Sequence, residues 1–93
     1  MDALTGRIIT DGVLTVTQKL TLLAAYSVAD GEGRFFIDEA AEVLGVGRGT
    51  VRAHLRILEA LGVVTTLEKG TQSSSTIYQI SKPLWEMKDD THL

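Results

Sequence analysis

The strongest hydrophobic pattern in the chain lies between residues 48 and 61. Apolar side chains and one histidine recur there at steps of three and four, which gathers on one helix face Val51, His54, Leu55, Leu58 and Leu61. At about 100° per residue, the opposite face carries Gly49, Arg52, Ala53 and Arg56. We therefore predict an amphipathic helix over residues 48–61, ended by Gly62, that keeps an arginine-bearing face in water.

A second helical pattern lies nearer the N-terminus, and its apolar positions are Leu20, Leu23, Ala24 and Val28. Thr15 is followed three residues later by Gln18, a pair that can satisfy two free amides at a helix start as a capping box. The pattern predicts a helix over residues 16–29. Gly31 would supply the left-handed residue that follows its C-terminus.

The segment between these two helices carries shorter patterns. The aromatic and β-branched run at residues 34–37 suits a brief strand. Asp38 then stands in the place of an N-cap. A short helix over residues 39–44, ended by Gly45, would turn inward Ala40, Ala41 and Leu44.

Two strand-like runs and a short helical segment complete the pattern. Residues 63–68 and 76–81 predict a β-hairpin around a loop that is rich in serine and contains a glycine. Ser81 as N-cap and Pro83 early in the first turn predict a short helix over residues 82–88.

Length and composition predict one domain over residues 1–93. A chain of 93 residues with 44% hydrophobic content can form a core without metals or disulfides. We divide it into an N-terminal arm or extension at residues 1–14, a core at 15–81, and a short helix and tail at 82–93. In the first segment, Asp11-Gly12 could turn a small hairpin, or the segment could be an irregular arm.

The composition also excludes several kinds of protein. The chain has no cysteine, so disulfides, thiolate metal sites and a cysteine nucleophile are excluded. The apolar stretches are interrupted before they reach the roughly 20 residues of a membrane span, and no secretory signal is recognised at the N-terminus. We therefore expect a cytoplasmic protein without a membrane partner.

Charge is unevenly distributed. The net charge is −3, and acidic side chains gather within residues 30–42 and near the C-terminus. By contrast, Arg48, Arg52 and Arg56 stand together with no acid among them. The sequence thus predicts a locally basic face on an acidic chain.

The order of these predicted elements is that of winged helix-turn-helix domains. Residues 44–64, LGVGRGTVRAHLRILEALGVV, resemble the turn, recognition helix and wing entry of bacterial and phage DNA-binding regulators and of phage and plasmid replication proteins. The resemblance covers residues 15–80. It implies an α+β, mostly helical fold with a three-helix core, a β-hairpin wing at residues 65–80, and double-stranded DNA as partner.

Two glycines depart from the usual pattern of this family. Gly47 stands where a serine commonly caps the recognition helix, and Gly49 stands where a second polar residue is common. The glycines could let the helix N-terminus approach a phosphate closely. Alternatively, Gly47 is merely an acceptable cap.

The candidate DNA-contacting residues of the helix are Arg48, Gly49, Thr50, Arg52, Ala53 and Arg56. Guanidinium groups at this spacing can reach guanine edges and phosphates when a helix lies in the major groove. We assign Arg52 to base contact and Arg48 and Arg56 to phosphates, and we expect Thr50 to be half-buried. The alternative is an ordinary solvated helix face.

The predicted hairpin loop supplies a second set of candidates, Lys69, Thr71, Gln72 and Ser73. These side chains can donate hydrogen bonds to phosphates or enter a minor groove. The alternative is a polar loop without a partner.

We expect the protein not to be an enzyme and to need no cofactor. Neither His54 nor His92 has neighbours at metal-ligand spacing, and we expect His54 at the edge of the core. No nucleophile motif surrounds the serines, and a small-molecule effector is not indicated.

Three functions remain open. We favour a small transcriptional regulator that binds specific DNA sequences as a homodimer. The homodimer is suggested by large apolar residues near the C-terminus, Leu84, Trp85 and Met87, although these could instead close the domain against its first helix. The alternatives are a replication, partition or recombination accessory factor of a phage or plasmid, and a winged helix that binds protein and not DNA.

Overall fold

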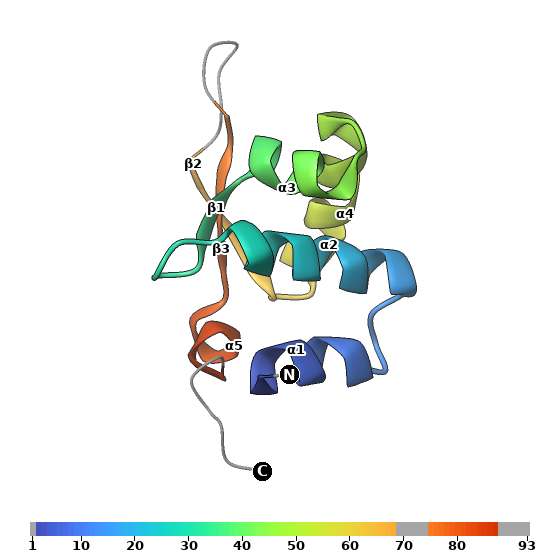
Figure 1. The fold of residues 1–93 in the computed structure, drawn as a ribbon, viewed down its shortest axis with the longest axis vertical. Helices are drawn as coiled ribbons and strands as arrows, with labels where there is room; N and C mark the ends of the chain where they lie inside the picture. Colours follow the sequence, from blue (N-terminus) through green and yellow to red (C-terminus); the bar gives the residue numbers. More distant parts are fainter. Residues whose placement is uncertain (1, 69–74, 88–93) are drawn as a thin grey trace.

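The computed structural model describes residues 2–68 and 75–87 (Figure 1). Helix α2 (Val16–Val28) begins at its predicted capping box. The amide of Gln18 donates to Thr15 Oγ1 at 3.2 Å, and the Gln18 side chain accepts from the Thr15 amide at 3.0 Å. The prediction for Gly31 is wrong. Ala29, in extended conformation, is the C-cap, and the positive φ of this turn falls on Gly33.

Helix α3 (Ile37–Leu44) starts earlier than predicted. Phe36 occupies the N-cap position without a side-chain hydrogen bond, so the assignment of Asp38 as N-cap is wrong. Asp38 lies in the first turn, where the helix dipole favours a carboxylate. The helix buries Ile37 and two alanines, as an inward-facing apolar stripe requires, and ends at Gly45 with φ 70°.

Helix α4 (Arg48–Ala60) presents most of the predicted apolar face to the core. Its fully buried side chains are Val51, Leu55 and Leu58, and His54 is half-buried at the edge of the core. Leu61, predicted to face inward, is 45% exposed. The helix has ended by this residue, and the chain turns at Gly62, whose φ is 80°.

A three-stranded antiparallel sheet packs beside these helices, with strand order β1-β3-β2. Its strands are β1 (Arg34–Phe36), β2 (Val64–Glu68) and β3 (Ile77–Ile80). Tyr78 of β3 pairs with Phe35 and stacks on it, with ring centroids 5.7 Å apart. Both rings are buried, so the centre of the sheet belongs to the core.

Residues 3–10 form helix α1 (Ala3–Thr10), so neither a hairpin nor an irregular arm is correct for this segment. The Asp2 carboxylate caps the helix by accepting from the Thr5 amide at 2.8 Å. The Tyr26 hydroxyl also donates to Asp2. One face of α1 is buried through Leu4 and Ile8, one helical turn apart.

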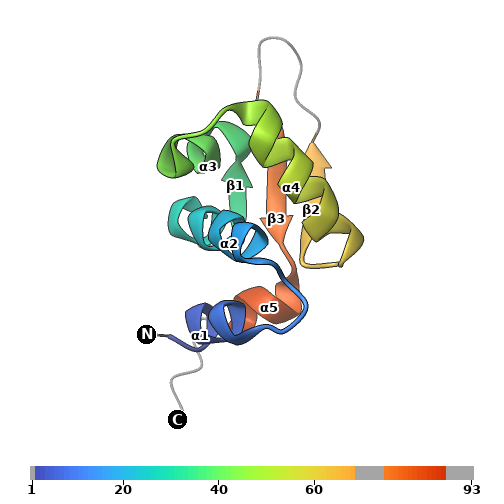
Figure 2. The ribbon, with the colours of Figure 1, turned by 90° about the vertical axis from the view of Figure 1, so that its right-hand side faces the viewer.

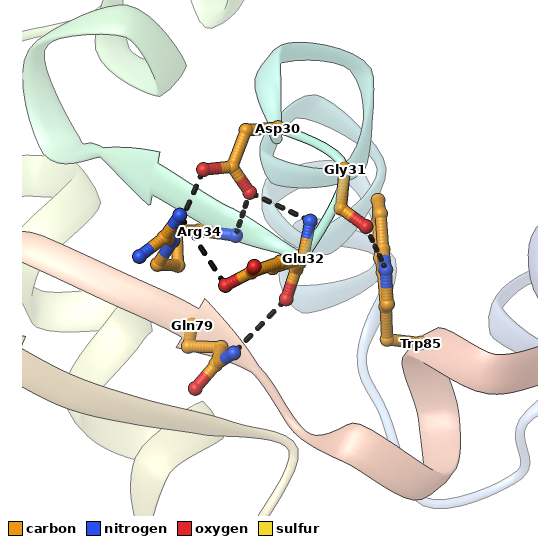
Figure 3. Close-up of polar contacts among 6 residues, drawn as sticks. All are labelled: Asp30, Gly31, Glu32, Arg34, Gln79 and Trp85. Atoms are coloured by element: carbon orange, nitrogen blue, oxygen red, sulfur yellow. Dashed lines mark hydrogen bonds and ion pairs between the residues drawn. The ribbon is translucent and has the colours of Figure 1, made fainter.

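Helix α5 (Lys82–Glu86) docks onto the same domain through Trp85. The indole nitrogen donates to the Gly31 carbonyl at 3.1 Å (Figure 3). The indole ring also meets the Tyr26 ring edge-to-face, with centroids 5.5 Å apart. Gly33 has φ 83°, and a Cβ built on it would lie 3.0 Å from the indole, so any other residue would be strained there. Trp85 is 9% exposed, and the expectation that it packs on a neighbouring subunit is therefore wrong.

The turn that receives Trp85 is held by Asp30. Its Oδ1 accepts from the amides of Glu32 at 2.8 Å and Arg34 at 3.0 Å, and its Oδ2 pairs with Arg34 Nε at 3.1 Å (Figure 3). The Gln79 side chain donates to the Glu32 carbonyl at 2.9 Å and joins the turn to β3. The turn is thus fixed between α2 and the sheet.

This turn should make folding stability sensitive to acid. The Arg34 and Glu32 amides, with Arg34 beside them, lower the pKa of the Asp30 carboxyl below its ordinary value. A lowered folded-state pKa stabilises the fold above about pH 4, and this contribution is lost as the pH falls through the folded pKa. Melting of Asp30→Ala between about pH 2 and pH 7 should therefore show a shallower acid dependence than melting of the wild type.

The elements separate toward two ends of the molecule (Figures 1 and 2). One end carries α3, the start of α4 and the ends of β2 and β3 that lead into residues 69–76. The other end carries α1 and α5. Within residues 2–68 and 75–87, none of the helices combines the length and apolar character that crossing a bilayer requires.

Candidate nucleic-acid interface

The outward face of α4 carries the predicted candidates in unequal environments. Gly49, Ala53 and Arg56 are exposed, whereas Arg52 is half-buried. Thr50 is exposed, so the expectation that it is half-buried is wrong. The small residues near the start of the helix leave its backbone accessible from solvent.

Arg48 is not a free cation, because the fold brings an acid to it. Its Nε lies 2.6 Å from Oδ1 of Asp38, in the first turn of α3. Both side chains keep about half of their surface, with 49% of Arg48 and 46% of Asp38 exposed. The sequence showed no acid among the three arginines, but the turn between α3 and α4 places one beside the first of them.

Arg52 and Arg56 act electrostatically on Tyr78 of β3. Burial raises the pKa of the Tyr78 hydroxyl above its ordinary value, and the charge of Glu59 adds to this rise, while the charges of Arg52 and Arg56 oppose it. Tyr78 itself is 5% exposed. Arg52 is half-buried, whereas Arg56 is exposed to solvent.

Glu59 links α4 to the neighbouring strand. Its Oε2 accepts from the amide of Thr66 at 2.8 Å and from the Thr66 hydroxyl at 2.6 Å. The contact fixes the distance between α4 and β2, two elements that Figure 2 shows side by side. These hydrogen bonds therefore tie α4 to β2.

Neither glycine at the start of α4 is required by internal packing. A Cβ on Gly47 or Gly49 would meet no atom within 4 Å, and Gly47 caps the helix without a side-chain hydrogen bond. Both interpretations of these glycines, close approach to a phosphate or an acceptable cap, are compatible with this open space.

The hairpin candidates Lys69, Thr71, Gln72 and Ser73 lie outside the described residues and remain predictions. Three described residues near these candidates were not predicted from the sequence to belong to the interface: Asp38, Thr66 and Tyr78. The acidic block contained Asp38, but its partner could not be identified from spacing alone. In residues 2–68 and 75–87, no three His, Asp or Glu side chains form a group that could hold a metal ion.

An open hollow of about 280 Å³ is lined by residues of α1, α2 and α5 and of the segments that adjoin them, and by none of the candidate residues of α4. Its lining is mainly apolar and includes Leu14, Leu22 and Leu84, with Arg7 and Asp11 on its polar side. The volume is slightly below the range that is usual for ligand pockets. We assign no effector to it.

The chain's fold is shared with known structures. No family model matches the chain, and no curated protein sequence matches it. A disulfide-bonded form of AbfR aligns with a TM-score of 0.68 and 16% identity over 94% of this chain and 57% of that chain. A fragment of a possible transcriptional regulatory protein from Mycobacterium bovis aligns with a TM-score of 0.56 and 21% identity, over 90% of this chain and 77% of the fragment. The chain has the winged helix-turn-helix fold.

In the terms of this fold, α3 and α4 form the helix-turn-helix, and β2 and β3 form the wing. The winged helix spans 57% of the length of the AbfR chain, so it matches only part of that protein. AbfR was solved with a disulfide, whereas these 93 residues contain no cysteine. Disulfide chemistry is therefore not shared by this winged helix.

Proposed function

We propose that this winged helix binds double-stranded DNA in a sequence-specific manner and acts as a small transcriptional regulator in the cytoplasm. Helix α4 lies in the major groove, and the wing contacts the flanking backbone. The proposal is supported by one observation above all. The exposed face of α4 combines small residues with Arg52 and Arg56, and it lies on the same end of the molecule as the wing.

The roles of the arginines follow from their surroundings. Arg52 is half-buried, which limits the freedom of its side chain and favours contact with a guanine edge. Arg56 is exposed and suits a phosphate, which can be reached from several directions. Gly49, Thr50 and Ala53 let the helix enter the groove closely.

A homodimer belongs to this proposal. Few cations face the DNA from one chain, and a symmetric pair would double the contacts and match a palindromic site. Because Trp85 is used within the domain, other surfaces must join the chains. Sedimentation of the chain with and without its DNA site measures the stoichiometry, and a single chain on a non-palindromic site would contradict the dimer.

Selection from a random pool of duplex DNA, followed by gel shifts at low and moderate salt, tests the proposal. We expect an enriched sequence and a retarded complex that weakens as salt rises. A pool without enrichment, together with no retardation of any fragment at low salt, would contradict DNA binding.

Lys69→Ala should weaken binding to all sequences alike. A wing lysine on a phosphate carries no sequence information, so its loss should lower the slope of log K against log salt by about one. Fluorescence anisotropy with the selected site and with a scrambled duplex measures this slope. A loss confined to the selected site would show that Lys69 reads bases and would contradict the phosphate assignment.

A protein-binding winged helix is the second candidate. It is favoured by large apolar side chains exposed around α4, with Val46 and Ile57 each 44% exposed and Leu20 53% exposed. The net charge of −3 also favours it. The gel shifts separate the two candidates, because only a DNA-binding domain would slow the migration of the DNA fragments. A replication, partition or recombination role would share the DNA-binding result and would place the selected sites in tandem near an origin.

A further inference from the structure

The ion pair between Arg48 and Asp38 joins the first turns of α4 and α3 on the proposed DNA surface. At 2.6 Å it is a charge-assisted hydrogen bond, and the pair carries almost no net charge. Exposed Arg56 has no ion pair of this kind within residues 2–68 and 75–87. The two arginines should therefore respond differently to a phosphate.

Asp38 stands where three elements meet. Its amide donates to the Ser75 hydroxyl at 3.4 Å, and the preceding amide, of Ile37, donates to the Thr76 carbonyl at 3.1 Å. These contacts connect the first turn of α3 to the base of the wing, and the carboxylate connects it to α4. The carboxylate position is thus set by the backbone of α3 and the wing together.

We infer that Asp38 determines the specificity of DNA binding by pairing with Arg48, an inference that rests on the proposed function. An unpaired arginine beside the groove binds the phosphates of any sequence. Paired with Asp38, Arg48 adds little to this general attraction, and the carboxylate repels phosphates that approach out of register. The pair holds the terminal guanidinium nitrogens of Arg48 in one orientation. Their N–H groups can then donate only to an acceptor on the DNA that lies at the matching position.

Asp38→Asn tests this role, with Glu86→Gln as the matched control. Both substitutions remove one negative charge, but exposed Glu86 lies on α5 at the opposite end of the molecule. Anisotropy titrations use the selected duplex and a scrambled duplex between about 50 and 200 mM salt. For Asp38→Asn we expect tighter binding to the scrambled duplex, a salt slope steeper by about 0.9, and a smaller ratio between the two affinities. Glu86→Gln should leave the slope and the ratio unchanged.

Arg48→Lys provides a second, independent variant. Lysine keeps the charge but lacks Nε and the planar arrangement of donors. We expect an unchanged salt slope and a reduced affinity ratio, and an unchanged ratio would contradict the positioning of Arg48 by Asp38. Melting curves confirm that each variant is folded.

The outcomes separate the two proposals. If Asp38→Asn behaves like Glu86→Gln while the wild type still prefers its selected site, the inference about Asp38 is wrong and the proposed function stands. If the wild type binds no DNA, both are wrong.

Discussion

Replacing Trp85 by alanine is expected to lower the free energy of unfolding by about 3–5 kcal/mol. The substitution removes a buried indole, its hydrogen bond to the Gly31 carbonyl and its contact with Tyr26. These contacts lie within one chain, so the loss should be the same at low and high protein concentration. Urea unfolding at two protein concentrations, tenfold or more apart, measures both features.

Leu67→Ala is the matched control for this prediction. Leu67 is also a large apolar residue, but it is 47% exposed on β2, and its truncation should change stability by less than about 1 kcal/mol. A Trp85→Ala defect that shrinks as the protein is diluted would show that the indole serves a subunit interface. That result would contradict the intramolecular docking of α5.

Replacing Arg52 by alanine is expected to weaken binding to the selected site by about 1–3 kcal/mol and to relax the sequence preference at one base pair. Arg52 is half-buried, so its guanidinium can meet a guanine edge with little further loss of side-chain freedom. Affinity measurements with the selected site and its single-base variants test both parts.

Arg7→Ala is the control for this second prediction. Arg7 is also an exposed arginine, with 62% of its side chain in solvent, but it lies on α1 at the opposite end of the molecule. It should leave affinity nearly unchanged. Equal losses from both substitutions would show a general effect of charge, and the assignment of Arg52 to base contact would be wrong.

The elements whose signals are local were predicted well from the sequence. The capping box at Thr15 and the left-handed glycines Gly45 and Gly62 act within a few residues, so α2, α3 and α4 were found close to their observed bounds. The hydrophobic period of α4 also placed its buried face correctly, apart from Leu61. Together with the resemblance, these signals were enough to predict the winged helix-turn-helix fold.

The features that were missed depend on contacts between distant residues. Helix α1 offers only Leu4 and Ile8 as a clear apolar pair, and it is held by packing and by the hydrogen bond between Asp2 and Tyr26. Trp85 was left open between a subunit interface and the domain core because its acceptor, Gly31, lies far away in sequence.

The candidate site remains a prediction, and the structure shows only where its residues on α4 lie. The arginine spacing correctly gave a face of α4, since that depends only on helix geometry. The partner of Arg48 comes from α3, and no sequence period relates it to α4. The differences among the three arginines therefore emerge only from the tertiary structure.

The most direct test of DNA binding through α4 and the wing is a two-dimensional NMR titration of the labelled chain with its selected duplex. We expect the largest amide shift changes in residues 47–57 and in β2 and β3, with α1 and α5 nearly unchanged. Changes confined to α1 and α5, or no changes at saturating DNA, would contradict the account.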